Sequence, residues 1–423
     1  MKYIIETIGC QMNENESFDL AETLSHSGIL QAKTLQEANI VILNTCSVRA
    51  QAEQKAFSFL GRAERIKKEN SSVKIIVIGC MAQRIPDKIK KRFKNIDFIA
   101  GTKEANLAEK ILKLLPFSEQ PKSLPKENLC CKLNFGKIVR HITIMKGCNN
   151  YCSYCVVPFV RGQEISFDYK KIMNDCVSMV ENGTKEIILL GQNVNSYKYG
   201  EIDFSKLISK IAKIESLTRI RFMTNHPKDL NDDLIEIMSK ESKVCRHIHL
   251  PMQSASDKIL EQMNRKYTFK HYLNLIKNLR TAMPDISITT DVIVGFPGES
   301  QKNFEETLNA IKDIKFDGLY VFRYSQRPNT KAAQIPDDVS LEEKKHRHSV
   351  ILKESNEISA KIAAAMVNTK QEVLGEKFEN GILSARTRSC RKVFITTDKT
   401  YLGKQFYAFI KSAKINSLFG EIR

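Results

Sequence analysis

Short apolar runs alternate with helix-like segments along most of this chain of 423 residues. Within residues 1–116, the predicted strands are Tyr3–Ile8, Ile40–Leu43, Ile75–Ile78 and Asp97–Ile99. The predicted helices between them include Gln51–Lys67 and Glu104–Leu115. This alternation is typical of a parallel sheet, because each parallel connection needs a crossover that is usually helical. The sequence therefore predicts an N-terminal parallel α/β domain over residues 1–116.

A second alternating region follows a proline-bearing linker at residues 117–137. Its six predicted strands are Ile138–Met145, Glu186–Leu190, Arg219–Met223, His247–Leu250, Ile286–Val294 and Leu319–Arg323. Six strand–helix units without a wide gap favour a full or partial (β/α)6 barrel over an open sheet. We place this domain at residues 138–366.

The last part of the chain has a different character. A long amphipathic helix is predicted from Ser340, which forms a capping box with Glu343. After it, Val393–Thr396 and Phe406–Ile410 are rich in β-forming residues, and glycines punctuate the segment. This pattern predicts a small C-terminal β-barrel over residues 367–423.

The sequence also excludes several classes of protein. No apolar run approaches the ~18 residues of a membrane helix. The N-terminal segment contains Glu6 and no small-residue cleavage site follows it, which is not typical of a secretory signal. We therefore expect a cytoplasmic protein with no membrane partner. In a reducing compartment, eleven cysteines are more typical of metal ligands or buried thiols than of disulfides.

Three of these cysteines form a C-x3-C-x2-C loop directly after the first predicted barrel strand. They are Cys148, Cys152 and Cys155. Three thiolates on so short a loop can hold one face of an iron–sulfur cluster and leave one iron open to a substrate. The alternatives are a zinc site or three incidental thiols. A structural zinc site usually has four ligands, and no His or fourth Cys lies close by in the sequence.

A second set of cysteines is spread over the N-terminal domain. Cys10, Cys46 and Cys80 each follow directly on an apolar run. If these runs are neighbouring parallel strands, the three thiols emerge at the carboxyl edge of one sheet, where α/β folds place ligands. The alternative is three buried core cysteines. The remaining five, which we interpret as structural or incidental, are Cys130, Cys131, Cys176, Cys245 and Cys390.

The C-x3-C-x2-C loop, with the aromatic Tyr154 before its last cysteine, resembles the signature of the radical S-adenosylmethionine superfamily. The turn that contains Gly295 and Gly298 resembles that family's adenosylmethionine-binding element. The resemblance implies that S-adenosylmethionine binds the open iron of a 4Fe-4S cluster. It also implies that Tyr154, Gly295 and Gly298 lie at the cofactor site.

Longer motifs narrow the resemblance. Segments Cys10–Asn13, Leu43–Arg49 and Gly79–Gln83 resemble the amino-terminal motifs of the methylthiotransferases. Segments Val156–Gly162 and Leu189–Tyr197 are similar to the tRNA-2-methylthio-N6-dimethylallyladenosine synthases. This resemblance implies a second 4Fe-4S cluster on the strand-end cysteines Cys10, Cys46 and Cys80. It further implies that Gly191, Gln192 and Asn193 lie at the cofactor site.

The activity implied is a transfer of a methylthio group to C2 of N6-isopentenyladenosine at position 37 of tRNA, next to the anticodon. Two alternatives stay open. The first is a methylthiotransferase of the same family that acts on threonylcarbamoyl-adenosine tRNA or on a ribosomal protein. The second is a non-catalytic iron–sulfur protein that binds RNA. As partners we expect the tRNA anticodon loop and an electron donor such as a flavodoxin-type reductant, and we expect a monomer.

The net charge of +18 favours a polyanionic partner. Basic residues are densest in residues 367–423, where eleven Lys and Arg face five Asp and Glu. This segment resembles the TRAM domain, which implies RNA binding through phosphate contacts. The alternative is a solvated basic face. The predicted RNA-binding residues are Arg386, Arg388, Arg391, Lys392 and Lys404.

Overall fold

The computed structural model describes residues 1–47, 50–104, 106–115 and 138–422. The predicted linker with Cys130 and Cys131 therefore lies outside the described residues, as do Val48 and Arg49. The described residues form two compact units. The first contains residues 1–115 with Lys146–Asn149 and Val156–Glu164, and the second contains the rest.

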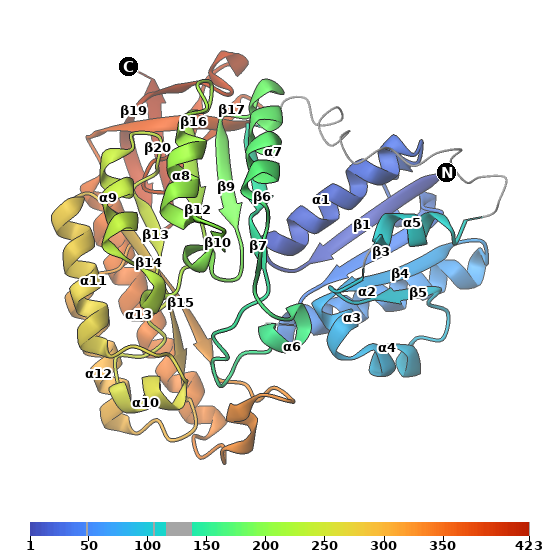
Figure 1. The fold of residues 1–423 in the computed structure, drawn as a ribbon, viewed down its shortest axis with the longest axis horizontal. Helices are drawn as coiled ribbons and strands as arrows, with labels where there is room; N and C mark the ends of the chain where they lie inside the picture. The colour runs from blue at the N-terminus through green and yellow to red at the C-terminus, as the bar shows by residue number, and fades with distance from the viewer. Residues whose placement is uncertain (48–49, 105, 116–137, 423) are drawn as a thin grey trace. The chain divides into compact units, whose positions relative to one another are not determined.

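The first unit is built on a parallel sheet of five strands in the order β2-β1-β3-β4-β5 (Figure 1). The strands are β1 (Lys2–Ile8), β2 (Leu30–Gln31), β3 (Ile40–Thr45), β4 (Lys74–Gly79) and β5 (Phe98–Ala100). The helices are α1 (Gln11–His26), α2 (Ala50–Glu69), α3 (Cys80–Arg84), α4 (Pro86–Arg92) and α5 (Leu107–Leu112). The stretch Val156–Glu164 of this unit contains α6 (Val157–Arg161).

The central strands of this sheet are buried on both faces. All six residues of β3 are buried, which matches its continuous apolar sequence. Alternate residues of β3 and β4 pack against α2 and α4 on one face and against α1 and α5 on the other. The structure confirms the predicted N-terminal parallel α/β fold.

The second unit contains the six predicted strands of the barrel, arranged as two three-stranded parallel sheets. One sheet has the order β12-β9-β6 and the other β13-β14-β15, and a parallel bridge between Ile220 and Val244 links them. The strands are β6 (Val139–Thr143), β9 (Glu186–Leu190), β12 (Arg219–Phe222), β13 (His247–His249), β14 (Ser287–Val294) and β15 (Gly318–Arg323). Short strands β7 (Met145–Lys146), β8 (Ile165–Ser166), β10 (Lys198–Tyr199) and β11 (Ile202–Asp203) lie in the connections. This is the predicted partial barrel.

Helices connect the barrel strands and pack against their outward faces. They are α7 (Tyr169–Glu181), α8 (Phe204–Ala212), α9 (Asp232–Lys240), α10 (Asp257–Gln262), α11 (Phe269–Ala282) and α12 (Gln301–Ile314). The long α13 (Leu341–Ala365) follows and packs on β15, α12 and β14. The Ser340 hydroxyl accepts a hydrogen bond from the Glu343 backbone N–H and so caps the first turn of α13.

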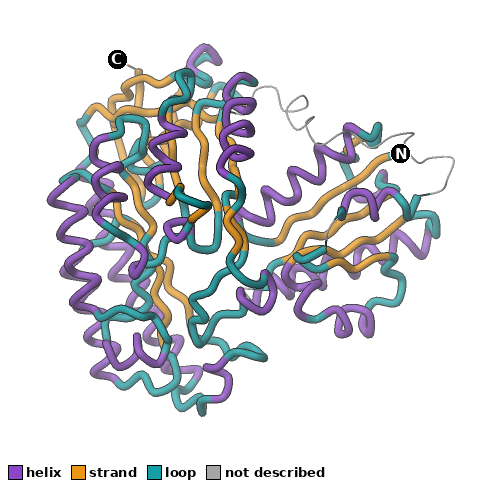
Figure 2. Tube along the Cα trace, in the orientation of Figure 1, coloured by secondary structure: helices purple, strands orange, loops and turns teal. Residues whose placement is uncertain are grey.

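The chain ends in a closed five-stranded barrel, the orange strands beside the C terminus in Figure 2. Its strands are β16 (Lys370–Glu379), β17 (Ile382–Thr387), β18 (Lys392–Thr396), β19 (Gln405–Lys414) and β20 (Ser417–Ile422). Inward-facing aliphatic side chains fill this barrel. The small C-terminal barrel predicted from the sequence is therefore present. Within the described parts of the chain, no helix is both long and apolar enough to cross a membrane.

Two buried arginines of β12 fasten the closed barrel to the six strands. Arg219 donates to the carbonyl oxygen of Arg386 at 2.7 Å and pairs with the Glu372 carboxylate at 3.0 Å. Arg221 donates to the carbonyl oxygens of Arg388 and Thr387 at 3.3 and 3.4 Å. It also pairs with Glu186 of β9, and the Arg221 and Glu186 side chains are at most 2% exposed. Fully buried charges of this kind are stable only when they are paired and hydrogen-bonded, so the contacts fix the closed barrel in place.

Candidate functional site

Three cysteines lie at one edge of the first unit's sheet. The neighbouring strands β1, β3 and β4 are parallel and end in register. Cys10 stands just beyond β1, Cys46 follows β3, and Cys80 follows β4 as the first residue of α3. The three side chains therefore leave the sheet at its carboxyl edge. Cys10 is exposed, whereas Cys46 and Cys80 are buried.

The three thiols interact electrostatically with one another and with a buried arginine. Burial raises the pKa of the Cys80 thiol to about 12, Arg161 opposes this shift, and Cys46, Glu16 and Cys10 add to it. Arg161 is 8% exposed, and its Nη1 lies 2.7 Å from Glu16 Oε1. A cation beside thiols stabilises their thiolate forms, which are the forms that bind metal.

The backbone and an amide pair shape the surroundings of these thiols. Gly79 has φ 93°, and a Cβ at this position would lie 2.5 Å from the Thr45 carbonyl oxygen, so only glycine fits there. The Asn13 side-chain amide donates to Asn44 Oδ1 at 2.9 Å, and the Asn44 amide donates to the Asn13 carbonyl oxygen at 3.0 Å. These buried contacts fix the backbone on which Cys10 and Cys46 stand.

The donor set at this edge consists of thiols, the usual protein ligands of iron–sulfur clusters. Among the described residues, no three His, Cys, Asp or Glu side chains are close enough to hold one metal ion together. In a 4Fe-4S cluster each thiolate binds a different iron, so the ligands lie farther apart than around one ion. Thiolates are the soft ligands that iron–sulfur clusters use, and here a cation lies beside three thiols.

The predicted C-x3-C-x2-C loop contains residues of both units. In the first unit, the Cys148 N–H donates to the Gly162 carbonyl oxygen at 3.3 Å. Gly147 has φ 76°, and a Cβ there would lie 1.9 Å from the Gln163 carbonyl oxygen. In the second unit, the Cys155 N–H donates to the Cys152 carbonyl oxygen at 2.9 Å, which closes a tight turn between these two cysteines.

Residues 263–265 hold the second-unit part of this loop. The Met263 carbonyl oxygen accepts from the Ser153 N–H at 3.0 Å. The Asn264 side-chain amide donates to the Tyr151 carbonyl oxygen at 2.9 Å, and the Arg265 Nη1 lies 3.5 Å from the Cys152 Sγ. These residues could not be predicted from the sequence, because they lie more than a hundred positions from the loop and no motif marks them.

Tyr154 connects the loop to the turn after β14. Its ring packs in an apolar cluster with Phe296 and Tyr324, and burial raises the pKa of its hydroxyl well above the ordinary value. In that turn Gly295 has φ 67°, and its N–H donates to Glu299 Oε2 at 2.6 Å. The structure therefore brings Tyr154 and the predicted glycine turn together around one cluster of aromatic rings.

An ion pair with Arg347 of α13 and a hydrogen bond to Asp338 brace this turn. Glu299 Oε2 lies 2.8 Å from Arg347 Nη1, and the two side chains are 1% and 6% exposed. The Gly298 N–H donates to Asp338 Oδ1 at 2.7 Å. The turn is thus held by a buried ion pair at Glu299 and by an exposed hydrogen bond at Gly298.

The predicted residues after β9 lie beside Thr224, which follows β12. The Thr224 hydroxyl donates to the Gly191 carbonyl oxygen at 2.6 Å. A Cβ at Gly191 would lie 2.5 Å from Met145 Cγ, so the backbone approaches its neighbours closely here. Asn193 is 1% exposed and donates to Asp229 at 2.7 Å. Gln192 stands between Gly191 and Asn193 in the same loop.

Several buried polar atoms that follow barrel strands have no partner among the described residues. Among them are Asn193 Oδ1, Asn225 Oδ1, His226 Nε2 and Gln253 Oε1. Burial lowers the pKa of His226 to about 2, with Arg265 and Lys228 adding to the effect, so its imidazole is neutral at physiological pH. Barrel enzymes bind ligands at this carboxyl end of the strands, and unsatisfied buried groups there suit a polar ligand. Asn225, His226 and Gln253 were not predicted as site residues, although each follows closely on a predicted strand.

The predicted RNA-binding arginines make contacts inside the protein. Arg386 forms a bidentate pair with Glu376, at 2.6 and 3.0 Å. Arg388 donates to the Val244 carbonyl oxygen at 2.8 Å, and Arg391 donates to the Asp317 carbonyl oxygen at 3.3 Å. By contrast, the predicted residues Lys392 and Lys404 are both exposed.

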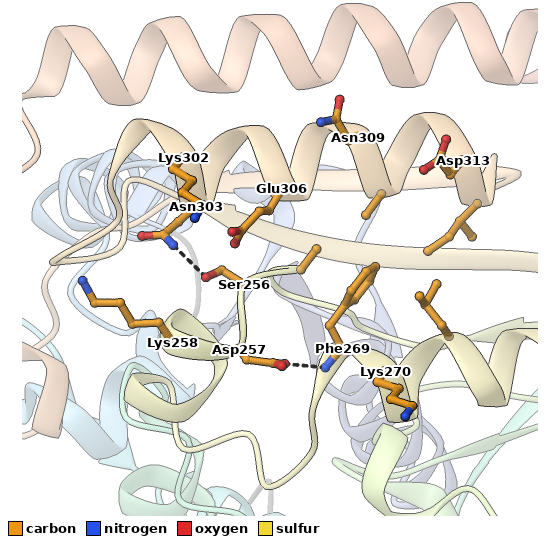
Figure 3. Close-up of a pocket in the computed structure, with 14 residues that line it drawn as sticks. Ser256, Asp257, Lys258, Phe269, Lys270, Lys302, Asn303, Glu306, Asn309 and Asp313 are labelled. Carbon is orange, nitrogen blue, oxygen red and sulfur yellow. Dashed lines mark hydrogen bonds between the residues drawn. The ribbon is translucent and has the colours of Figure 1, made fainter.

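A surface hollow of about 850 Å³ lies between α10, α11 and α12. Within it the Asn303 side chain donates to Ser256 Oγ at 2.8 Å, and the Phe269 N–H donates to Asp257 Oδ1 at 2.6 Å (Figure 3). Of the described residues that line it, none is a predicted cluster ligand or cofactor residue. The hollow is therefore separate from the residues that carry the predicted chemistry.

Comparisons with known proteins cover both units. A model of the Radical SAM superfamily matches residues 142–311, and a model described as "Uncharacterized protein family UPF0004" matches residues 2–101. A tRNA-2-methylthio-N(6)-dimethylallyladenosine synthase of Endomicrobium trichonymphae is 60% identical over 423 residues and 100% of both chains. A synthase of the same name from Thermodesulfovibrio yellowstonii is 43% identical over 93% of this chain and 92% of the relative.

Solved structures share the fold at low identity. The radical S-adenosylmethionine methyltransferase TsrM from Kitasatospora setae aligns with a TM-score of 0.56 at 12% identity. The alignment covers 78% of this chain and 74% of that one. This likeness concerns the fold alone.

Proposed function

This chain belongs to the tRNA-2-methylthio-N(6)-dimethylallyladenosine synthase family, and we propose that it adds a methylthio group to C2 of N6-isopentenyladenosine at position 37 of tRNA. It is a radical S-adenosylmethionine transferase that uses a 4Fe-4S cluster and S-adenosylmethionine. The observation that carries the tRNA substrate is the 60% identity to a synthase of that name over the full length of both chains. The alternatives of another substrate or a non-catalytic role are not favoured.

Cys148, Cys152 and Cys155 would hold the cluster that binds S-adenosylmethionine. The fit rests on their three thiols and on Gly147, where a side chain would collide with the backbone. When bound, this cluster supplies the electron that cleaves the sulfonium of adenosylmethionine to a 5′-deoxyadenosyl radical. Such a radical is needed because the C2–H bond of an adenine is not activated for polar chemistry.

We further propose a second 4Fe-4S cluster on Cys10, Cys46 and Cys80. The support is their common position at the sheet edge, the neighbouring Arg161 cation and the glycine at position 79. When bound, this cluster supplies the sulfur that, once methylated by a second S-adenosylmethionine, is transferred to the adenine. Arg161 would neutralise part of the negative charge that three thiolates bring to the site.

The chain's own residues would bind and orient the nucleotide cofactor. Gly295 lets the turn pack closely against α13, because a Cβ there would lie 2.2 Å from Lys344 Cγ and its φ of 67° suits glycine. The unpartnered Asn193 Oδ1 and Gln253 Oε1 accept hydrogen bonds from polar groups of a bound ligand. The ring cluster around Tyr154 excludes water from the base of the loop.

The closed C-terminal barrel would hold the anticodon loop through exposed cations. Lys392 and Lys404 are exposed, and Tyr407 on β19 is 60% exposed and free to stack on a base. Arg386, Arg388 and Arg391 instead would set the barrel's geometry through their internal contacts. We also propose that a flavodoxin-type reductant supplies electrons, and that the protein acts as a monomer in the cytoplasm.

The test is a reaction with defined tRNA. The purified chain is reconstituted anaerobically with iron and sulfide and given dithionite, S-adenosylmethionine and tRNA that carries or lacks the isopentenyl group. We expect mass spectrometry of the digested tRNA to show the methylthio nucleoside only with isopentenylated tRNA, and not with the Cys148→Ala variant. A methylthio product on threonylcarbamoyl-adenosine tRNA, with none on isopentenylated tRNA, would refute the proposed substrate.

A further inference from the structure

Arg265 places a buried guanidinium against a predicted ligand of the first cluster. The residue is 4% exposed, and its Nη1 lies 3.5 Å from the Cys152 Sγ. Its Nε donates to the Tyr267 hydroxyl at 3.1 Å, and its Nη2 donates to the Pro251 carbonyl oxygen at 3.0 Å. The guanidinium is therefore anchored on two sides, and a third N–H is directed at sulfur.

No carboxylate balances this buried charge among the described residues that interact with it most strongly. These are Tyr267, Tyr154 and Cys152, two phenols and a thiol. A buried cation normally lies beside an anion, because the loss of hydration is otherwise uncompensated. A metal-bound Cys152 is a thiolate. The positive charge of Arg265 therefore has an anion beside it when the loop carries its cluster.

The guanidinium is also fixed relative to the loop. The Tyr267 hydroxyl, which accepts from Arg265, donates onward to the Met252 carbonyl oxygen at 2.8 Å. The adjacent Asn264 amide holds the Tyr151 carbonyl oxygen, one residue before Cys152. Arg265 and Cys152 are thus held by the same short segment, and their contact does not depend on a mobile side chain.

We propose that Arg265 is a positioning residue that donates a charge-assisted hydrogen bond to the Cys152 sulfur and raises the reduction potential of the cluster on Cys148, Cys152 and Cys155. This inference rests on the proposed function. Reduction adds one electron, taken from a low-potential donor, and makes the cluster one unit more negative. A fixed cation and an N–H donor at a ligand sulfur stabilise the more negative form. The residue therefore eases the electron transfer that precedes cleavage of adenosylmethionine.

The test measures the midpoint potential of this one cluster. The full chain carries Cys10→Ala, Cys46→Ala and Cys80→Ala, so that one cluster remains, and is titrated with dithionite while electron paramagnetic resonance reports the reduced state. Arg265→Gln removes the charge. Arg246→Gln is the matched control, because that arginine forms an exposed ion pair with Asp285.

We expect Arg265→Gln to lower the equilibrium constant for reduction about tenfold, which is about 59 mV for one electron. Arg265→Lys, which keeps a charge but loses the planar fork, should give an intermediate value. Arg246→Gln should leave the potential unchanged. A fully loaded Arg265→Gln protein with an unchanged potential would overturn the proposal.

The remaining outcomes are also decisive. If Arg265→Gln takes up no iron, the Arg265→Lys protein decides: a lowered potential supports the proposal and an unchanged one overturns it. If neither variant takes up iron, Arg265 is needed for the fold of the loop, and the role in potential is rejected. If the protein with Arg265 intact takes up no iron, the proposed function fails instead.

Discussion

Arg347→Met tests the brace of the predicted adenosylmethionine turn. In the structure Arg347 Nη1 lies 2.8 Å from Glu299 Oε2, and the Glu299 carboxylate is 1% exposed. Glu299 also accepts the Gly295 N–H at 2.6 Å, so it joins the turn to α13. Without Arg347, the buried Glu299 carboxylate keeps the hydrogen bond from the Gly295 N–H but loses its cation. Glu343, the other carboxylate that pairs with Arg347, can turn into water instead.

The size of the effect follows from the burial. Removal of one partner of a buried pair costs about 3–5 kcal/mol of unfolding free energy. For a large domain this is a fall in Tm of about 10 °C. An arginine in an exposed pair, such as Arg246 with Asp285, contributes about 0–1 kcal/mol, so Arg246→Met is the matched control.

The effect depends on pH with a defined sign. Burial raises the pKa of Glu299, and the Gly295 N–H and Arg347 act against that shift, so the pKa rises further in Arg347→Met. A carboxyl group with a raised pKa in the folded state destabilises the fold above its unfolded pKa of about 4.3. The cost decreases by about 1.4 kcal/mol per pH unit as pH falls below the folded pKa, because the carboxyl group then takes up a proton.

The assay is calorimetry of the variant and the parent protein at about pH 8 and about pH 5.5, the range over which a raised carboxyl pKa takes effect. The difference in Tm between Arg347→Met and the parent protein should be smaller at the lower pH. The double variant Arg347→Met with Glu299→Gln should recover more than half of the loss, since no charge is then buried. The KM for S-adenosylmethionine should rise in the single variant. A gap in Tm that is the same at both pH values, or a double variant no more stable than the single one, would refute this reasoning.

Two further substitutions test the proposed cluster and RNA contacts. Cys10→Ala should abolish methylthio transfer and leave 5′-deoxyadenosine formation intact. Cys176→Ala, on the buried face of α7, is the control and should leave both intact. Transfer that survives Cys10→Ala would exclude Cys10 as a cluster ligand. The double variant Lys392→Glu with Lys404→Glu should weaken tRNA binding about tenfold or more and reduce its salt dependence. The control Lys240→Glu, at the exposed end of α9, should change neither. Equal tRNA binding by the parent protein and both variants would exclude this barrel surface as the RNA-binding site.

The fold could be predicted from the sequence wherever the spacing of apolar residues and the length of each apolar run are informative. Ile75–Ile78 is a continuous apolar run, and it forms the core of β4 because both faces of that strand are covered by helices. The strand-end positions of Cys46 and Cys80 follow directly from where these runs stop. The cap at Ser340 could also be predicted, because the bond from the Glu343 N–H is local.

The contacts that complete the site could not be predicted, because they join distant parts of the chain. Arg265 approaches Cys152 only after the helix α10 and its turn have folded back onto the loop. Likewise Arg391 counts as a basic residue in the sequence, but in the structure it donates to Asp317 in the connection before β15. Charge density predicts that a segment is basic, and only packing determines which of its cations remain exposed.

The two-cluster arrangement is the central claim, and the iron content of three reconstituted proteins tests it most directly. The intact chain should bind about eight irons, and about four should remain in each of two variants. One variant has alanine at Cys10, Cys46 and Cys80, and the other has alanine at Cys148, Cys152 and Cys155. Only the first should still form 5′-deoxyadenosine. An intact chain with about four irons, or a variant without Cys10, Cys46 and Cys80 that keeps about eight, would contradict the account.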